Sequence, residues 1–196
     1  MGQPQAVCTP EHIVHLSDSP LSAARALAAF VSEGFRNRDV ILVVARPETW
    51  NLAAVELAGE HALLAKAVAD GRLVVRDSTR TLAASLAGEM PAADRFETAV
   101  AALVHDCAGR GGQLRIYGDM VDLLARDGRF DAAARLEELW NEHATHVSFT
   151  LLCGYSSSHF THAGDASALD VVCGLHSRHD FDAQDVAAQQ LLAASR

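Results

Sequence analysis

Residues 39–46 have the sequence DVILVVAR, an almost unbroken run of β-branched and aliphatic side chains. A strand with one face in water alternates apolar and polar residues, and this run shows no such alternation. It therefore predicts a strand that is covered on both faces, as strands are in parallel sheets. The flanking segments then have to supply the helices that cover it.

Helical and strand-like patterns alternate on both sides of this run. Ser19 and Pro20 suit the start of a helix, apolar residues recur at helical spacing as far as Phe35, and Gly34 indicates a stop. Further strands are predicted in 71–77, 109–120 and 147–155. Further helices are predicted in 48–70 with a break near Gly59, in 77–90, after Pro91, in 130–146, and twice in the tail 165–196, separated near Asp180.

This order of elements predicts an α/β fold of three layers, with helices on both faces of a mostly parallel central sheet. The chain of 196 residues is long enough for one sizeable core, and no linker rich in proline, glycine or serine divides it. We therefore expect residues 1–196 to form a single domain.

The charge and the apolar segments exclude several classes of partner. The formal net charge is −9 and the chain has one lysine, Lys66, which argues against a nucleic-acid surface. The first residues do not resemble a signal peptide, and no apolar run approaches the roughly 20 residues of a membrane span. We expect a cytoplasmic protein that binds neither nucleic acid nor membrane.

The four cysteines are scattered without CxxC spacing, which favours reduced thiols over a disulfide framework. Cys107 shares a helical face with Phe96 and Val100, so it is predicted to be a core residue. Cys153 ends a strand beside Gly154; a buried core position is favoured there, and a nucleophile or a redox thiol is the alternative.

Common catalytic motifs are missing. The turn in VVARPETW, residues 43–50, has neither the glycines nor the Lys-Ser/Thr of a P-loop, and the glycine cluster at 109–112 precedes a strand instead of following one. No GxSxG occurs. These absences predict that nucleotides are neither bound tightly nor hydrolysed.

Histidines and a cysteine at intervals of three raise the question of a metal site. CGLHSRH contains Cys173, His176 and His179, and HFTH contains His159 and His162. Residues three apart share a helical face only roughly, and no second ligand pair has zinc-finger spacing. We therefore expect no metal and no cofactor.

Polar residues stand where the apolar run of QLRIYGDMVDLL, residues 113–124, gives way to a helical pattern. Ligands bind at such strand ends in open α/β sheets, and strand alternation places Arg115, Tyr117 and Asp119 on one side, so they could line one pocket. In the alternative, Asp119 caps the next helix, Arg115 pairs with an acidic neighbour and Tyr117 packs. Both interpretations stay open.

Two other pairs have ordinary structural explanations. His12 and His15 are three apart in EHIVHL and are consistent with a surface position, and Trp140, which precedes Asn141, is expected to pack in the core.

Six stretches in a fixed order resemble a known family. They are EHIVHLSDS (11–19), FVSEGFRNRDVILVVARPE (30–48), GRLVVRDSTRTLAASL (71–86), LRIYGDMVDLLARDGRFDAAARLEELWN (114–141), FTLLCGY (149–155) and VCGLHS (172–177). Together they resemble the MEDS domain, the methanogen/methylotroph, DcmR-type sensory domain. The family usually has an aromatic pair where Leu16-Ser17 stand here, a glutamate at Asp119, and a proline after Tyr155.

The resemblance implies a degenerate RecA/KaiC-like core that has lost its phosphate loop, and a sensory role alone or joined to histidine kinases and transcription regulators. We therefore expect a non-enzymatic signalling module that binds a small ligand, a regulatory protein partner of that kind, or both; a homodimer is left open. The expected ligand-binding residues are His12, His15, Arg115, Tyr117, Asp119, Trp140, Asn141, Cys153, Tyr155 and His176. The alternatives are a Cys/His-dependent or metal-assisted hydrolase, and a scaffold that associates through an apolar helix face.

Overall fold

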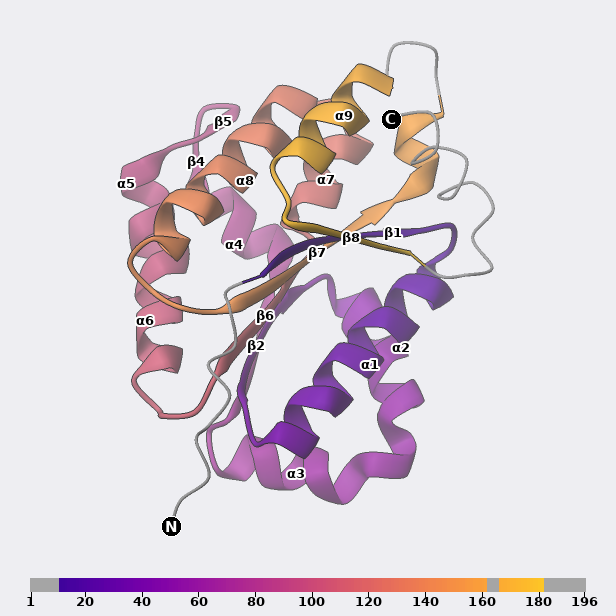
Figure 1. Cartoon of the computed structure of the whole chain (residues 1–196), viewed down its shortest axis with the longest axis vertical. Coiled ribbons are helices and arrows are strands. Elements are labelled where there is room, and N and C mark those ends of the chain that lie inside the picture. The colour runs from indigo at the N-terminus through magenta and orange to yellow at the C-terminus, as the bar shows by residue number, and fades with distance from the viewer. Residues whose placement is uncertain (1–10, 162–165, 182–196) are drawn as a thin grey trace.

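A six-stranded parallel sheet lies between two layers of helices (Figure 1). The computed structural model describes residues 11–161 and 166–181. The strand order is β3-β2-β6-β7-β1-β8. The bounds are β1 (His12–Ser17), β2 (Val40–Ala45), β3 (Leu73–Asp77), β6 (Leu114–Gly118), β7 (Thr150–Ser156) and β8 (Arg178–Phe181).

Each face of the sheet has its own set of helices and its own core. One face packs against α1 (Pro20–Asn37), α2 (Pro47–Glu56), the short η1 (Leu57–Glu60) and α3 (His61–Ala69). The other packs against α4 (Ser78–Ser85), α5 (Ala93–Phe96), η2 (Glu97–Ala101), α6 (Ala102–Ala108), α7 (Met120–Arg126), α8 (Phe130–Ala144), η3 (Ser157–Phe160) and α9 (Ala166–Gly174). A short antiparallel pair, β4 (Leu86–Ala87) and β5 (Met90–Pro91), follows α4.

The strand predicted from DVILVVAR is confirmed as β2, and every residue of it is buried. Val40, Leu42 and Val44 belong to the core beneath α4–α9, and the residues between them belong to the core beneath α1–α3. The missing alternation thus reflects two apolar faces. The three-layer α/β fold is confirmed as well. Within the described ranges, no helix combines the length and the apolar character that crossing a membrane requires.

Helix α1 begins as predicted, because the Ser19 hydroxyl accepts a hydrogen bond from the Ser22 N–H at 3.2 Å. Its predicted stop at Gly34 is wrong, since the helix continues to Asn37 and ends at Arg38, which has a φ of 62°. A Cβ on Gly34 would lie 2.7 Å from the Ile41 side chain. Gly34 therefore marks a close approach of helix and sheet.

Two strands of the six-stranded sheet were not predicted. HIVHLS forms β1 between β7 and β8, and its two polar histidines obscured the apolar pattern of a central strand. The tail was expected to break between two helices near Asp180, but residues 178–181 form β8. Because β8 is an edge strand, its sequence RHDF can be polar. Cys8, His162 and the last predicted helix lie outside the described residues.

Gly154 on β7 leaves room for a neighbouring ring. A Cβ at this position would lie 2.6 Å from the Tyr117 hydroxyl oxygen, and Tyr117 is itself 1% exposed. Neither group can move into open space, so the contact requires glycine. Gly118, on the adjacent strand β6, has no atom within 4 Å of the corresponding Cβ.

Gly154→Ala should therefore lower the free energy of unfolding by about 1–3 kcal/mol through overpacking. Gly118→Ala is the matched control in the same sheet and should be neutral or slightly stabilising. Urea denaturation of both variants measures the difference. Equal stability of the two variants would show that the Tyr117 ring does not require the glycine.

Candidate functional site

Most of the expected site residues gather on one face of the sheet, beneath α8 and α9. Around the carboxylate of Glu137 lie His12, Cys153, Tyr155 and His176; we call these five residues the Glu137 cluster. The expected residues Trp140 and Asn141 border it on α8. His15, Arg115, Tyr117 and Asp119 lie elsewhere.

Regular secondary structure places the cluster. Cys153 and Tyr155 are two residues apart on β7, so both point to the face that α8 covers. His12 begins β1, and strand alternation places it on the same face as Val14. Glu137 lies on α8, and His176 follows the end of α9. Segments distant in sequence thus converge on one carboxylate.

Glu137 is fully buried, and four side chains surround its oxygens. The Tyr155 hydroxyl donates to Oε1 at 2.8 Å, and the Cys153 thiol donates to Oε2 at 3.2 Å. His12 Nε2 lies 3.1 Å from Oε2, and His176 Nε2 lies 3.2 Å from Oε1. Burial alone would raise the pKa of Glu137, but the two histidines hold that pKa far below its usual value.

Fixed acceptors orient both histidines. His12 Nδ1 lies 2.9 Å from Asn141 Oδ1, and the Asn141 amide donates to the Leu175 carbonyl at 2.9 Å. His176 Nδ1 lies 2.6 Å from the Val172 carbonyl oxygen. Each Nδ1 therefore carries a hydrogen, and each Nε2 points at Glu137. Burial lowers the pKa of His176, but Glu137 outweighs it and the pKa lies above its usual value.

Cys153 is not set up as an activated nucleophile. Burial, and then the adjacent Glu137 carboxylate, raise the pKa of its thiol well above the usual value. The same two causes raise the pKa of Tyr155. Both groups are therefore proton donors to Glu137, whereas a catalytic cysteine needs a lowered pKa.

A pocket of about 350 Å³ opens beside the cluster. Its apolar walls include Trp140, Phe149, Leu151 and Leu175. Its polar residues include His12, Asn141 and His176, which connect it to the buried carboxylate. An apolar cavity with a few convergent polar groups is the usual form of a small-molecule site.

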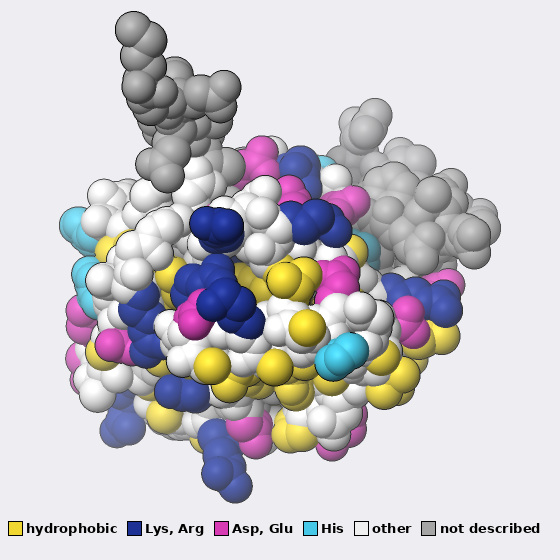
Figure 2. Space-filling model, turned by 90° about the horizontal axis from the view of Figure 1, so that it is seen from below, with side chains coloured by type: hydrophobic (Ala, Val, Ile, Leu, Met, Phe, Trp, Pro, Cys, Tyr) yellow, Lys and Arg dark blue, Asp and Glu magenta, His cyan; other side chains and the backbone are white. Residues whose placement is uncertain are grey.

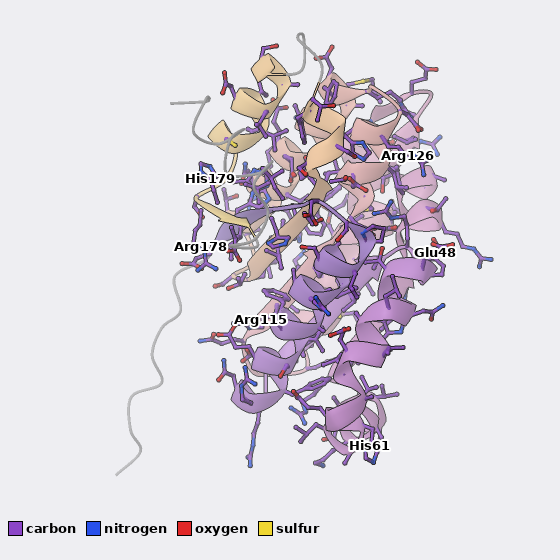
Figure 3. All side chains as sticks on the ribbon, turned by 90° about the vertical axis from the view of Figure 1, so that its right-hand side faces the viewer. Glu48, His61, Arg115, Arg126, Arg178 and His179 are labelled. Atoms are coloured by element: carbon purple, nitrogen blue, oxygen red, sulfur yellow. The ribbon has the colours of Figure 1, made fainter. Side chains whose placement is uncertain are left out.

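Arg115 and Asp119 do not line one pocket, so that expectation is wrong. Arg115 lies near the start of β6, where it pairs with Asp39 at 2.9 Å and Glu33 at 3.0 Å and its guanidinium lies over the Phe30 ring. Asp119 follows the opposite end of the strand. Figure 3 shows Arg115 beside α1, away from the labelled Glu48 and Arg126 at the other edge. The predicted pairing of Arg115 and packing of Tyr117 are both present.

His12 and His15 also separate, because residues three apart on a strand face opposite sides of the sheet. His15 is buried on the α1 side, with Nδ1 3.9 Å from an Asp180 carboxylate oxygen. It lines a hollow of about 560 Å³ together with Arg115. The three metal ligands suggested by CGLHSRH do not come together either. His176 joins the Glu137 cluster, while Cys173 and His179 do not.

Asp119 occupies the N-cap position of α7, but its side chain forms an ion pair and does not cap the helix. Its side chain makes no cap hydrogen bond to α7 and instead accepts from Arg46 Nε at 3.1 Å and from the Thr49 hydroxyl at 3.2 Å. Arg46 also binds Asp122 at 2.7 Å, and Asp122 lies 3.0 Å from His159 Nε2. Arg46 is thus neutralised by two buried carboxylates.

A second hollow, of about 830 Å³, lies at the carboxyl ends of the strands and is bordered by Arg46, Thr49, Asp122 and His159. Its lining includes the acidic side chains of Glu48, Asp77, Asp122 and Asp127 beside Arg46 and Arg126. The turn after β1, residues 17–20, has the sequence SDSP and contains neither glycine nor lysine. Such a lining is unsuited to a polyphosphate.

The Asp122 carboxylate should make stability depend on pH. Burial opposes its ionisation, but His159 and Arg46 outweigh burial, so its pKa lies below the usual value. A lowered folded-state pKa stabilises the chain above the unfolded pKa of about 3.9, and this contribution disappears as the pH falls through the folded value. Asp122→Asn should cost about 1–3 kcal/mol at pH 7, and the difference from the wild type should shrink below about pH 4.

Denaturant unfolding between pH 3 and 7 measures this difference. Asp127→Asn, at an exposed position on the same hollow, is the control, because an exposed ion pair contributes little to stability. A difference between wild type and Asp122→Asn that stays constant with pH would contradict the assignment.

Comparison with known families supports the resemblance seen in the sequence. A search of curated proteins finds no match to the chain. The sequence model of the family described as "MEDS: MEthanogen/methylotroph, DcmR Sensory domain" matches residues 11–177, which include the whole Glu137 cluster. The chain therefore belongs to the MEDS family of sensory domains.

Proposed function

We propose that this sensory domain binds a small, largely apolar molecule in the pocket beside the Glu137 cluster and transmits the bound state to a regulatory protein. The observation that carries the proposal is the pocket of about 350 Å³ whose aromatic and aliphatic walls end at a buried polar network. The apolar walls supply binding energy, and the few polar groups select and orient the ligand.

The position of the pocket suits a switch. Its lining comes from β1, from α8, from β7 and from the segment that follows α9. An occupant would contact all of these at once, so its affinity would depend on how they are packed. A ligand shifts a conformational equilibrium only through such differential affinity.

The output would pass to a protein partner, such as a histidine kinase or a transcription regulator, or to a second copy of the chain. Four large apolar side chains are exposed on α2 and α3, on the opposite side of the sheet: Leu52, Val55, Leu63 and Val68. Figure 2, which views the molecule from the end where α3 lies, shows hydrophobic side chains in a band among charged ones. The surface formed by the four exposed side chains of α2 and α3 is our candidate for the partner contact.

We also infer that the fold derives from a RecA/KaiC-like ATPase core that has lost its phosphate loop. The parallel sheet supports this inference, as do the turns after β1 and β2, which lack the glycines and lysine that cradle phosphates. Such a loss would remove nucleotide hydrolysis, whereas the sensory role rests on the family match.

Trp140 provides a direct test of the ligand site. The chain has two tryptophans, and Trp50 packs against the other core, so Trp50→Phe leaves Trp140 as the reporter. A panel of small apolar and amphipathic molecules should include members that change its fluorescence in a saturable way. Ala144→Leu, which fills the pocket, should weaken that binding at least tenfold, or about 1.4 kcal/mol.

Ala134→Leu is the matched control, because Ala134 lies on the same helix but does not line the pocket. It should leave the affinity unchanged. Equal affinity of the Ala144→Leu and Ala134→Leu variants would place ligand binding elsewhere and contradict the proposal.

A hydrolase is the second candidate, because Cys153, His12 and His176 converge as such an enzyme requires. The raised pKa of the Cys153 thiol argues against it. We expect Cys153 in the folded chain to resist alkylation at pH 7, as judged by peptide mass spectrometry, because thiolate is the reactive form. Rapid alkylation, together with ester hydrolysis that is lost in Cys153→Ser, would favour the enzyme instead.

A further inference from the structure

We propose that His12, Glu137, Cys153 and His176 bind a divalent transition-metal ion, Zn²⁺ in the first place, between α8, α9 and the sheet. The expectation of a metal-free chain rested on the spacing of Cys173, His176 and His179 in CGLHSRH. Of these three residues, only His176 belongs to the group proposed here. This inference goes beyond ligand binding in the neighbouring pocket and does not depend on it.

The geometry is close to that of an assembled site. One ligand atom from each of the four side chains lies within 4.8 Å of all the others. Cys153 Sγ lies 3.2 Å from Glu137 Oε2 and 3.4 Å from His12 Nε2. In a tetrahedral zinc site, ligand atoms about 2.0–2.3 Å from the ion are roughly 3.2–3.7 Å from one another. Small rotations of the side chains would therefore admit the ion.

The donor set identifies the class of metal. A thiolate, two imidazoles and one carboxylate are all common zinc ligands. Mg²⁺ and Ca²⁺ take oxygen ligands, and here only Glu137 offers one among the four. The combination of sulfur and imidazole nitrogen among the four ligand atoms favours Zn²⁺ over those ions.

The outer hydrogen bonds fix the ligands in the form that binds a metal. Asn141 Oδ1 and the Val172 carbonyl accept from Nδ1 of His12 and His176, which leaves both Nε2 atoms to face the site. The Asn141 amide is itself held by the Leu175 carbonyl. Tyr155 donates to Glu137 Oε1 and leaves Oε2 for the ion. Metal-binding histidines and carboxylates characteristically have such partners.

A divalent cation would also balance the charges of the cluster. If both imidazoles are neutral, their Nε2 lone pairs point at carboxylate oxygens 3.1–3.2 Å away, which is repulsive. If both are protonated, two positive charges face one buried carboxylate. A divalent ion removes both difficulties, because the Cys153 thiolate and the Glu137 carboxylate together balance its charge. His176 Nε2 is fully buried and makes no hydrogen bond of acceptable geometry, as expected of a ligand atom.

The pocket supplies a path for the ion. The Glu137 side chain is inaccessible to solvent, whereas the His12 side chain is 11% exposed and lines the pocket of about 350 Å³. The ion would join β1, α8, β7 and the segment after α9 at one point. A bound metal would therefore lie against the space in which we place the ligand.

The test uses the full chain, stripped with a chelator and then titrated with Zn²⁺ or Co²⁺. We expect one equivalent of Zn²⁺ by elemental analysis, and with Co²⁺ a thiolate charge-transfer band and the strong visible absorption of a tetrahedral site. Cys153→Ser should abolish the charge-transfer band. His176→Gln should weaken Zn²⁺ binding by more than the roughly 10–100-fold that is typical for loss of an outer partner, and Asn141→Ala should weaken it within that range.

Cys173→Ser and His179→Gln are the matched controls. They alter a cysteine and a histidine of the same segment that are not in the cluster, and they should bind Zn²⁺ and Co²⁺ like the wild type. The proposal is overturned if the stripped wild type binds less than one equivalent in a competition assay, or if the Co²⁺ spectrum lacks the thiolate band. It is also overturned if the control substitutions, and not Cys153→Ser, remove that band. Ligand binding reported by Trp140 is measured separately, so failure of either proposal is distinguishable from failure of the other.

Discussion

A carboxylate removed from water costs several kcal/mol unless its oxygens receive enough hydrogen bonds and positive charge. Glu137 meets this requirement with side chains from β1, from β7 and from the segment after α9. None of these groups is near Glu137 in the sequence. The Glu137 carboxylate therefore receives its hydrogen bonds only when α8 and α9 are packed on the sheet. The pocket lined by Trp140 lies where this network reaches solvent. An occupant there contacts both an apolar wall and a charged network that binds several elements together.

Much of the fold could be predicted from apolar periodicity. DVILVVAR indicated β2 because both faces of a central parallel strand are buried, and Ser19-Pro20 indicated the start of α1 because capping is local. Periodicity failed where a strand contains polar residues. The histidines of β1 belong to opposite faces, and the polar residues of β8 lie at an edge. These strands are defined by their neighbours in the sheet, which a local pattern does not contain.

Most residues of the candidate site were among those expected from the sequence, but the central residue, Glu137, was not. His12, Asn141, Cys153 and His176 were expected to bind a ligand, whereas Glu137 in LEELWNE resembles its exposed neighbours Glu138 and Glu142. Its position three residues before Trp140 and four before Asn141 puts it on their helical face, and this signal could have identified it. Arg115 and Asp119 were grouped because strand alternation places them on one side of the sheet, but this argument does not account for the length of β6 that separates them.

The central claim is that fixed acceptors hold His12 and His176 with their Nε2 atoms directed at Glu137. Long-range ¹H–¹⁵N NMR of the histidine rings tests it most directly, with Asn141→Ala as the variant that releases His12 alone. We predict a proton on Nδ1 of both rings, with Nε2 bound to a cation, and a change confined to His12 in the variant. Rings protonated on Nε2 and unprotonated on Nδ1 would contradict the account.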